Sequence, residues 1–173
     1  MGIKKNRIGI LGGSFDPAHK GHLAISKVAA KKLKLKKIFW AITKKNPFKK
    51  KSYLDLSARI KLCKKITKKI KFIEVKCFEN KVGSNKTVNL INFFAKNIKN
   101  EVFFIMGADN LINFHKWYKW KIISKKCTLI VFDRQGYKKK SLNSKTYKTL
   151  NKEKLKFINF NKVNISSSQL RKI

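Results

Sequence analysis

Residues 7–22 read RIGILGGSFDPAHKGH, and this stretch decides the fold. The apolar run Ile8–Leu11 predicts a buried strand that ends at a pair of glycines. From Gly21 to Leu33 the apolar residues recur at helical spacing, with lysines on the other face. A strand, a glycine turn and a helix in this order are typical of a sheet whose ligand site lies beyond the carboxyl ends of its strands.

The rest of the chain continues the alternation of short apolar runs and helical patterns. Further strands are predicted over 37–42, 70–76, 102–106, 127–132 and 157–160. Helices are predicted over 55–69, 87–98, 110–124 and 166–173, while 133–151 is too polar to assign. Strands separated by helices predict an α/β protein with a Rossmann-like, doubly wound parallel sheet, helices on both faces and a single domain over residues 1–173.

Composition limits the function classes. The chain has 173 residues and a formal net charge of +36, and it has only four arginines against forty lysines. A hydrophobic content of 43% excludes a disordered polyelectrolyte. Such a charge favours nucleic acid or an anionic membrane as partner, but proteins that read nucleic acid use the bidentate guanidinium of arginine. The lysine excess therefore indicates a composition bias along the whole chain, and we expect no specific nucleic-acid partner.

The location of the protein is predicted from its cysteines and its apolar runs. Cys63, Cys77 and Cys127 are odd in number and widely spaced, which favours free thiols over disulfides or a zinc site. The first apolar run is too short for a signal peptide or a membrane span. We therefore expect a cytoplasmic protein without a membrane partner.

The glycine turn carries the first candidate site. Gly12 and Gly13 let the backbone approach an anion closely, and the helix that follows offers N–H groups at the positive end of its dipole. His19 and His22 are three residues apart at this helix start, so both project toward whatever the helix end binds. Their imidazoles suit the oxygens of a triphosphate. A zinc site is the weaker alternative, because Asp16 in the same tight loop would have to be the third ligand.

A second candidate site lies near the end of the chain. Ser166 and Ser167 belong to a serine run that predicts a helix start rich in donors, and Arg171 follows one turn later. The alternative is an ordinary serine cap with a surface arginine. Arginine is scarce in this chain, which favours a second phosphate cradle.

Together the motifs GGSFDPAHKGH (12–22) and ISSSQLR (165–171) resemble those of the HxGH-type nucleotidyltransferase superfamily. The segment FFIMGADNL (103–111), followed by Trp117 and Tyr118, resembles bacterial nicotinate-nucleotide adenylyltransferases. The resemblance covers nearly the whole chain. It implies transfer of AMP from ATP to nicotinate mononucleotide, giving nicotinate adenine dinucleotide and pyrophosphate in NAD biosynthesis.

The resemblance also implies a division of the site between two ligands. The residues expected to bind ATP are Gly12, Gly13, Ser14, Phe15, His19, His22, Lys49, Gly107, Ser166, Ser167 and Arg171, with His19, His22 and Arg171 as the catalytic residues. Those expected to bind the nicotinate nucleotide are Thr87, Asp109, Trp117 and Tyr118.

Several of these assignments have a physical basis beside the resemblance. Trp117 offers a flat surface for a pyridine ring, and Asp109 can accept hydrogen bonds from ribose hydroxyls. Where many relatives have a histidine, this chain has Phe48, so Lys49 is either a charge for the triphosphate or a solvated loop lysine. Arg134 follows the strand over 127–132, and we expect it to be structural or peripheral to the site.

No protein nucleophile is expected, and Asp16 is expected to brace its loop. With only eight acidic residues, we predict no dedicated metal site and expect Mg²⁺ to arrive on the phosphates of ATP. Alternative acceptors are nicotinamide mononucleotide and phosphopantetheine, and a basic nucleic-acid-binding protein is the alternative from another class. The oligomeric state is left open.

Overall fold

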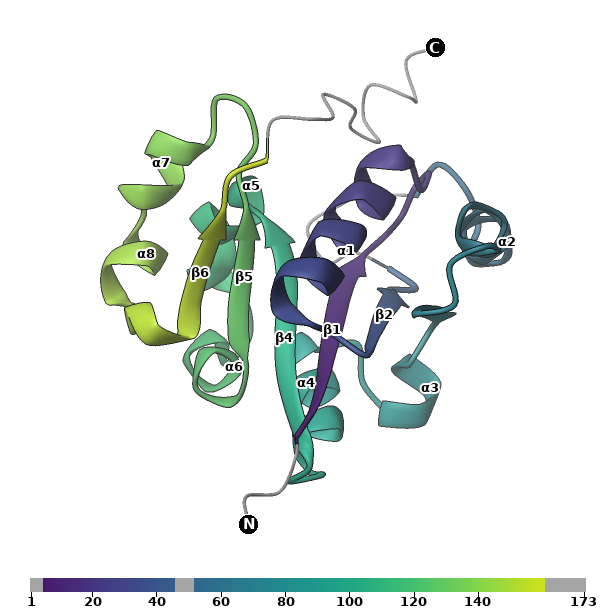
Figure 1. The fold of residues 1–173 in the computed structure, drawn as a ribbon, viewed down its shortest axis with the longest axis horizontal. Helices are drawn as coiled ribbons and strands as arrows, with labels where there is room; N and C mark the ends of the chain where they lie inside the picture. Colours follow the sequence, from purple (N-terminus) through teal and green to yellow (C-terminus); the bar gives the residue numbers. More distant parts are fainter. Residues whose placement is uncertain (1–4, 46–51, 161–173) are drawn as a thin grey trace.

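The computed structural model describes residues 5–45 and 52–160 and places six parallel strands in one sheet (Figure 1). The strands are β1 (Asn6–Gly13), β2 (Lys37–Ile42), β3 (Ile73–Lys76), β4 (Asn100–Gly107), β5 (Thr128–Phe132) and β6 (Leu155–Ile158). Their order across the sheet is β3-β2-β1-β4-β5-β6. The predicted Rossmann-like, doubly wound α/β fold is confirmed.

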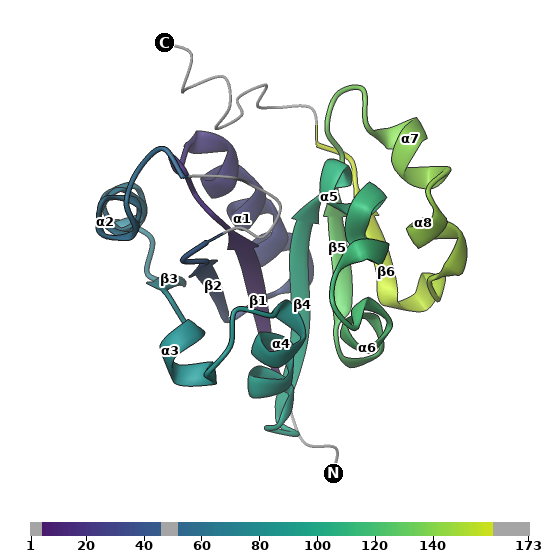
Figure 2. The ribbon, with the colours of Figure 1, turned by 180° about the vertical axis from the view of Figure 1, so that it is seen from behind.

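Helices connect the strands and cover both faces of the sheet. The longer ones are α1 (Lys20–Leu33), α2 (Leu56–Thr67), α4 (Thr87–Ala95) and α6 (Trp120–Lys126). The shorter ones are α3 (Glu79–Val82), α5 (Ala108–Asn113), α7 (Lys138–Leu142), α8 (Lys145–Thr149) and two single 3₁₀ turns at Phe114–Lys116 and Lys152–Lys154. The face with α1 is seen in Figure 1, and the face with α4 and α6 in Figure 2.

Two hydrophobic cores result, one on each face. Because side chains alternate along a strand, Phe103 and Ile105 of β4 join the core under α1 and α2, whereas Phe104 and Met106 join the core under α4 and α6. Strands buried on both faces are continuous apolar runs, which is why the sequence marks them clearly.

Along the chain, strands are first added on one side of β1 and then on the other. This strand pairs in parallel with β2 on one side and with β4 on the other. The chain leaves β1 through α1 to one face and leaves β4 through α5 to the other, so a crevice opens beyond the carboxyl ends of these two strands. The glycine turn that ends at Ser14 and the segment that begins at Gly107 both lie at this crevice.

The predicted element boundaries hold best where the apolar pattern is strong. The strand over 37–42 has the bounds predicted for it. The strand predicted over 70–76 begins only at Ile73, because Ile70 closes a turn with its N–H bonded to the carbonyl of Thr67. The last strand is Leu155–Ile158, two residues before the one predicted over 157–160, and 133–151 forms α7 and α8.

The single helix predicted over 110–124 was wrong. The segment forms α5, a 3₁₀ turn and α6 instead. Trp117 is extended and Lys119 has a left-handed φ of 51°, so the chain changes direction twice between the two helices. The terminal helix predicted over 166–173 lies outside the described residues.

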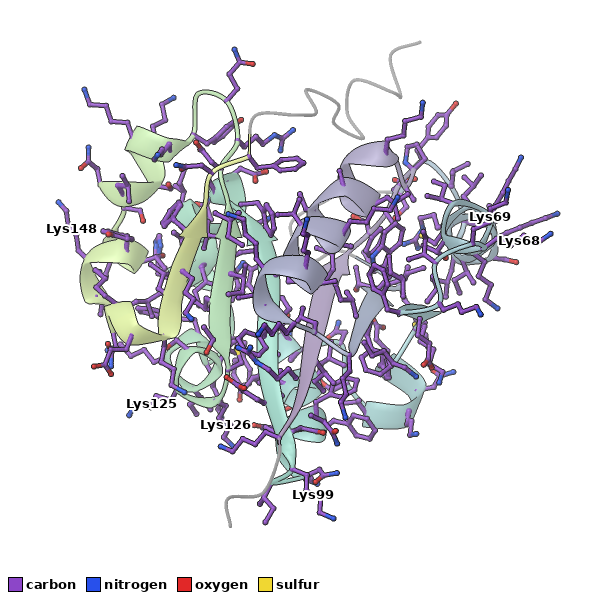
Figure 3. All side chains as sticks on the ribbon, in the orientation of Figure 1. Lys68, Lys69, Lys99, Lys125, Lys126 and Lys148 are labelled. Atoms are coloured by element: carbon purple, nitrogen blue, oxygen red, sulfur yellow. The ribbon has the colours of Figure 1, made fainter. Side chains whose placement is uncertain are left out.

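The lysines lie on many elements rather than on one face. Figure 3 labels Lys68 and Lys69 at the end of α2, Lys99 before β4, Lys125 and Lys126 in α6, and Lys148 in α8; all six are exposed. This spread is what a composition bias along the chain predicts.

The three cysteines are not paired with one another, and two of them are buried. All three cysteines are free, and burial raises the pKa of Cys63 and Cys127 to about 12, so neither thiol is a nucleophile at neutral pH. Within residues 5–45 and 52–160, no helix has the length and apolar character needed to cross a membrane.

The central strand β4 predicts a stability effect. Ile105 is fully buried, so Ile105→Ala is expected to lower the free energy of unfolding by about 2–5 kcal/mol, since the methyl groups removed leave a cavity. The measurement is urea denaturation followed by fluorescence. Ile98→Ala is the matched control: Ile98 is 75% exposed, and its loss should change stability by less than about 0.5 kcal/mol. Equal effects of the two substitutions would contradict the assignment of the core.

Candidate active site

The β1–α1 loop is held in an unusual conformation by buried side chains. Phe15 has a φ of 47°, which is rare for a residue with a side chain, and its ring is buried against Trp40 at a centroid distance of 5.0 Å. Asp16 is also buried, and its two carboxylate oxygens accept hydrogen bonds from the backbone N–H groups of Tyr53 and Leu54 at 2.7 and 2.9 Å. These contacts support the expectation that Asp16 braces the loop.

His19 and His22 together form a capping box at the start of α1. The Nδ1 of His19 accepts the N–H of Gly21 at 3.1 Å, and the Nδ1 of His22 accepts the N–H of His19 at 3.2 Å. Their ring centroids are 3.8 Å apart. Because each Nδ1 is an acceptor, the proton of each neutral ring must be on Nε2. The two imidazoles therefore carry Nε2–H donors for a ligand.

The core fixes the position of His22. Trp40 donates through Nε1 to the Oγ of Ser26 at 2.9 Å, and Ser26 donates to the carbonyl of His22 at 2.8 Å. The ring of Phe15 lies 4.8 Å from the imidazole of His22. A chain of hydrogen bonds and ring contacts thus runs from β2 through α1 to the histidine.

Both histidines are neutral in this environment. Burial, followed by the positive charge of Arg134, lowers the pKa of His19 from 6.5 to about 4. Burial is again the largest cause for His22, with His19 and Arg134 contributing, and lowers its pKa to about 3. Near pH 7 the pair therefore donates hydrogen bonds without carrying charge.

A cleft of about 760 Å³ lies in front of this loop, beyond the carboxyl ends of β1 and β4. The predicted site residues that line it are Gly12, Gly13, Ser14, Phe15, His19, His22, Thr87, Gly107, Asp109, Trp117 and Tyr118. The structure thus brings together residues up to 106 positions apart in the chain. Lys49, Ser166, Ser167 and Arg171 lie outside the described residues, so the convergence of the two phosphate motifs stays a prediction.

Asp109 and Arg134 form an ion pair at the cleft, with Nη1 2.7 Å from Oδ2. Arg134, expected to be structural or peripheral to the site, lines the cleft, and its charge lowers the pKa of both histidines. A Cβ at Gly107 would meet Oδ1 of Asp109, so a side chain at this position would require the Asp109 carboxylate to move.

The far side of the cleft is made by α4 and by the segment before α6. Thr87 is the first residue of α4, and Lys86, its N-cap, makes no capping bond through its side chain. The N-terminal end of this helix offers positive partial charge and N–H groups to the cleft. Trp117 packs against Phe114 with a centroid distance of 5.2 Å and lines the cleft.

The three neighbouring aromatic residues have different places. Trp117 lines the cleft and touches the core, and Tyr118 lines the cleft while 55% exposed. Trp120 packs against Phe114 in the core. This agrees with the expectation that at least one of the three is a packing residue.

Sequence reasoning missed the contacts of three residues at or beside the cleft, although it named Arg134. Arg59 is 2% exposed and donates to four backbone carbonyls, Glu79 accepts from Thr43 and from the N–H of Lys44, and Arg134 pairs with Asp109. The scarcity of arginine was a signal that could have found two of them. Nothing in the sequence marks Glu79.

The carboxylates at the cleft do not form a metal cage. In the described part of the chain no group of three histidine, cysteine, aspartate or glutamate residues is placed to hold a metal ion. Glu79 accepts hydrogen bonds from the loop after β2, and Asp109 forms an ion pair with Arg134.

A parallel α/β sheet with a glycine turn and two histidines beyond the carboxyl ends of β1 and β4 defines this protein as a nucleotidyltransferase. The model of the cytidylyltransferase-like family matches residues 10–173. A probable nicotinate-nucleotide adenylyltransferase from Pelagibacter ubique (strain HTCC1062) is 69% identical over 98% of this chain and 94% of its own. One from Bradyrhizobium sp. (strain BTAi1) is 36% identical over 86% of this chain and 78% of its own. The chain belongs to the cytidylyltransferase-like family and, within it, to the nicotinate-nucleotide adenylyltransferases.

Solved structures agree on the fold. The structure of Plasmodium falciparum nicotinic acid mononucleotide adenylyltransferase complexed with NaAD has a TM-score of 0.78 and 21% identity, over 96% of this chain and 83% of that one. A putative nicotinate-nucleotide adenylyltransferase from Vibrio parahaemolyticus has a TM-score of 0.65 and 19% identity, over 96% and 85%.

The histidine pair predicts a pH dependence. Both pKa values are lower in the folded protein than the ordinary 6.5, so the unfolded chain binds more protons from about pH 6.5 down to about pH 3. The stability contributed by the neutral rings is complete above pH 6.5 and is lost as the pH falls through this window. By NMR, both rings should remain in the Nε2–H form at pH 5.5, where an ordinary histidine is about nine-tenths protonated. Titration of either ring above pH 6 would contradict the assignment.

Proposed function

We propose that this chain transfers AMP from ATP to nicotinate mononucleotide. A phosphate oxygen of the mononucleotide attacks the α-phosphorus of ATP, forming a P–O bond while the bond between that phosphorus and the bridging oxygen to the β-phosphate breaks. Nicotinate adenine dinucleotide forms and pyrophosphate leaves. The observation that carries the proposal is one cleft with a neutral histidine pair on one side and a helix N-terminus with an aromatic residue on the other.

The histidines serve the triphosphate. Their Nε2–H groups donate to phosphoryl oxygens, where charge develops as the leaving group departs. A phosphate oxygen is already a nucleophile at neutral pH, so no general base is required, and catalysis consists of positioning and charge stabilisation. Gly12, Gly13, Ser14 and Phe15 shape the backbone around the phosphates, and Arg134 adds a positive charge at the same side.

The opposite side of the cleft serves the pyridine nucleotide. The N-terminus of α4 at Thr87 suits a carboxylate, because the helix dipole and backbone N–H groups favour negative charge there. Trp117 presents a ring surface to a pyridine, with Tyr118 beside it. Asp109, held by Arg134, accepts hydrogen bonds from a ribose.

Transfer from a nucleoside triphosphate generally uses a divalent metal, and we propose Mg²⁺ carried by ATP. The described residues fit this arrangement, because they offer no carboxylate cage and Mg²⁺ commonly keeps substrate phosphates as ligands. We further propose that Lys49, Ser166, Ser167 and Arg171 complete the phosphate site. A single domain over residues 1–173 and a cytoplasmic location, supported by three free cysteines, belong to the same proposal.

The deciding experiment compares acceptors. Pyrophosphate release is measured with Mg·ATP and, side by side, nicotinate mononucleotide, nicotinamide mononucleotide and phosphopantetheine. We expect the nicotinate nucleotide to have the highest kcat/KM, because the helix N-terminus favours a carboxylate over an amide. Faster reaction with either alternative acceptor would assign the chain to a different substrate.

Two variants separate the halves of the cleft. His22→Ala should lower kcat/KM by about a hundredfold, because it removes a donor that acts in the transition state.

Trp117→Ala should raise KM for the nicotinate nucleotide far more than KM for ATP, because only the pyridine stacks there. Steady-state kinetics with each substrate varied in turn gives the comparison. A loss below about threefold for His22→Ala, or equal effects of Trp117→Ala on both KM values, would contradict these roles.

A further inference from the structure

Arg59 of α2 is buried among backbone carbonyls beside the cleft. The residue is 2% exposed, and within residues 5–45 and 52–160 no ion pair with a carboxylate balances its charge. Its donors go to peptide oxygens instead: Nη1 donates to the carbonyls of Ser14 and Thr43, both at 2.8 Å. Nη2 donates to the carbonyl of Lys44 at 2.9 Å, and Nε to that of Leu54 at 3.2 Å.

These four carbonyls belong to three different segments. Ser14 lies in the β1–α1 loop, Thr43 and Lys44 directly follow β2, and Leu54 precedes the N-cap of α2. One planar guanidinium therefore connects the glycine turn to both segments beside it. Lysine has a single nitrogen with three donors and cannot reach four acceptors in this arrangement.

Asp16 makes the reciprocal connection. It belongs to the β1–α1 loop and accepts the N–H groups of Tyr53 and Leu54, while Arg59 from α2 reaches back to Ser14. Both backbone groups of Leu54 are thus bound, its N–H by the carboxylate of Asp16 and its carbonyl by the guanidinium of Arg59. A buried anion and a buried cation lock the loop and the start of α2 together.

Glu79 holds the same segment from the other direction. Its Oε1 accepts from the Oγ1 of Thr43 and from the N–H of Lys44, both at 2.8 Å. The segment Thr43–Lys44 is therefore fixed at both of its carbonyls by Arg59, and at the Thr43 hydroxyl and the Lys44 N–H by Glu79. A further backbone bond joins the N–H of Thr43 to the carbonyl of Gly13 at 3.0 Å.

We propose that Arg59 is a positioning residue for the proposed adenylyl transfer: it sets the geometry of the β1–α1 loop and thereby aims His19 and His22 at the triphosphate. This inference rests on the proposed function. Arg59 acts through Ser14 and the loop, since its own donors are used by backbone carbonyls. Because a misplacement of about 1 Å can cost a hundredfold in rate, a folded variant without this geometry should be slow.

The first test is Arg59→Lys, which keeps the positive charge but not the planar fork. At a temperature at which the variant is fully folded, we expect kcat to fall by about a hundredfold while KM for nicotinate mononucleotide changes little. Arg7→Lys is the matched control, because Arg7 pairs with Glu101 at 3.0 Å at the opposite end of the sheet. A kcat for Arg59→Lys within threefold of the control would overturn the proposal.

The second test reads the histidines directly and needs no acceptor. In the wild type, NMR of the imidazole nitrogens should show both rings as Nε2–H tautomers and a rise of their pKa values when Mg·ATP binds, since the triphosphate favours the protonated form. In Arg59→Lys we expect mixed tautomers and a weaker response. Unchanged histidine spectra in the variant would overturn the positioning role. If the wild type shows this response but does not react with nicotinate mononucleotide, the proposed function fails while the role of Arg59 stands.

The third test guards against a variant that merely loses stability. Arg59→Ala should regain activity with methylguanidinium added at concentrations too low to denature the protein, because the added cation can occupy the same carbonyls. Asp16→Asn combined with Arg59→Lys should be no slower than the slower single variant, because both substitutions disrupt the same connection. Absence of rescue together with multiplicative losses would overturn the proposal.

Discussion

The parallel pairing of β1 with both β2 and β4 is the constraint on which the rest of the structure depends. It places the ends of three strands at one edge of the sheet, where backbone groups of the loops are no longer used by strand pairing. The loops must then be held by side chains, because unpaired polar groups near the core are costly. Asp16 and Arg59 meet this need beside the glycine turn. The order of the strands thus creates both the cleft and the demand for buried polar contacts around it.

The two histidines show how a structural contact can also prepare a chemical group. Each Nδ1 is used to cap α1, and this leaves the Nε2–H of each neutral ring as the donor for a ligand. Burial and the charge of Arg134 keep His19 neutral, and His22 is neutral for similar reasons. A neutral pair can stay closely packed before an anion arrives, whereas two protonated rings with centroids 3.8 Å apart would repel each other.

Arginine has particular importance in this lysine-rich chain. Lysines occupy the exposed positions of many elements, where a point charge on a flexible stem suffices. The three described arginines each contact specific partners: Arg7 pairs with Glu101, Arg59 binds four carbonyls, and Arg134 pairs with Asp109. The four carbonyls around Arg59 require a planar group with donors in fixed directions, and lysine does not provide it.

By itself, the sequence determined the alternating strands and helices, the glycine turn and the closeness of His19 to His22, because these depend on local periodicity and short spacing. Only the tertiary structure decided that 110–124 breaks into separate helices, that Arg134 turns into the cleft and that Arg59 connects three loops. Long side chains choose their partners among backbone groups far away in the chain. Those groups come together only when the sheet has formed, so no local pattern records the choice.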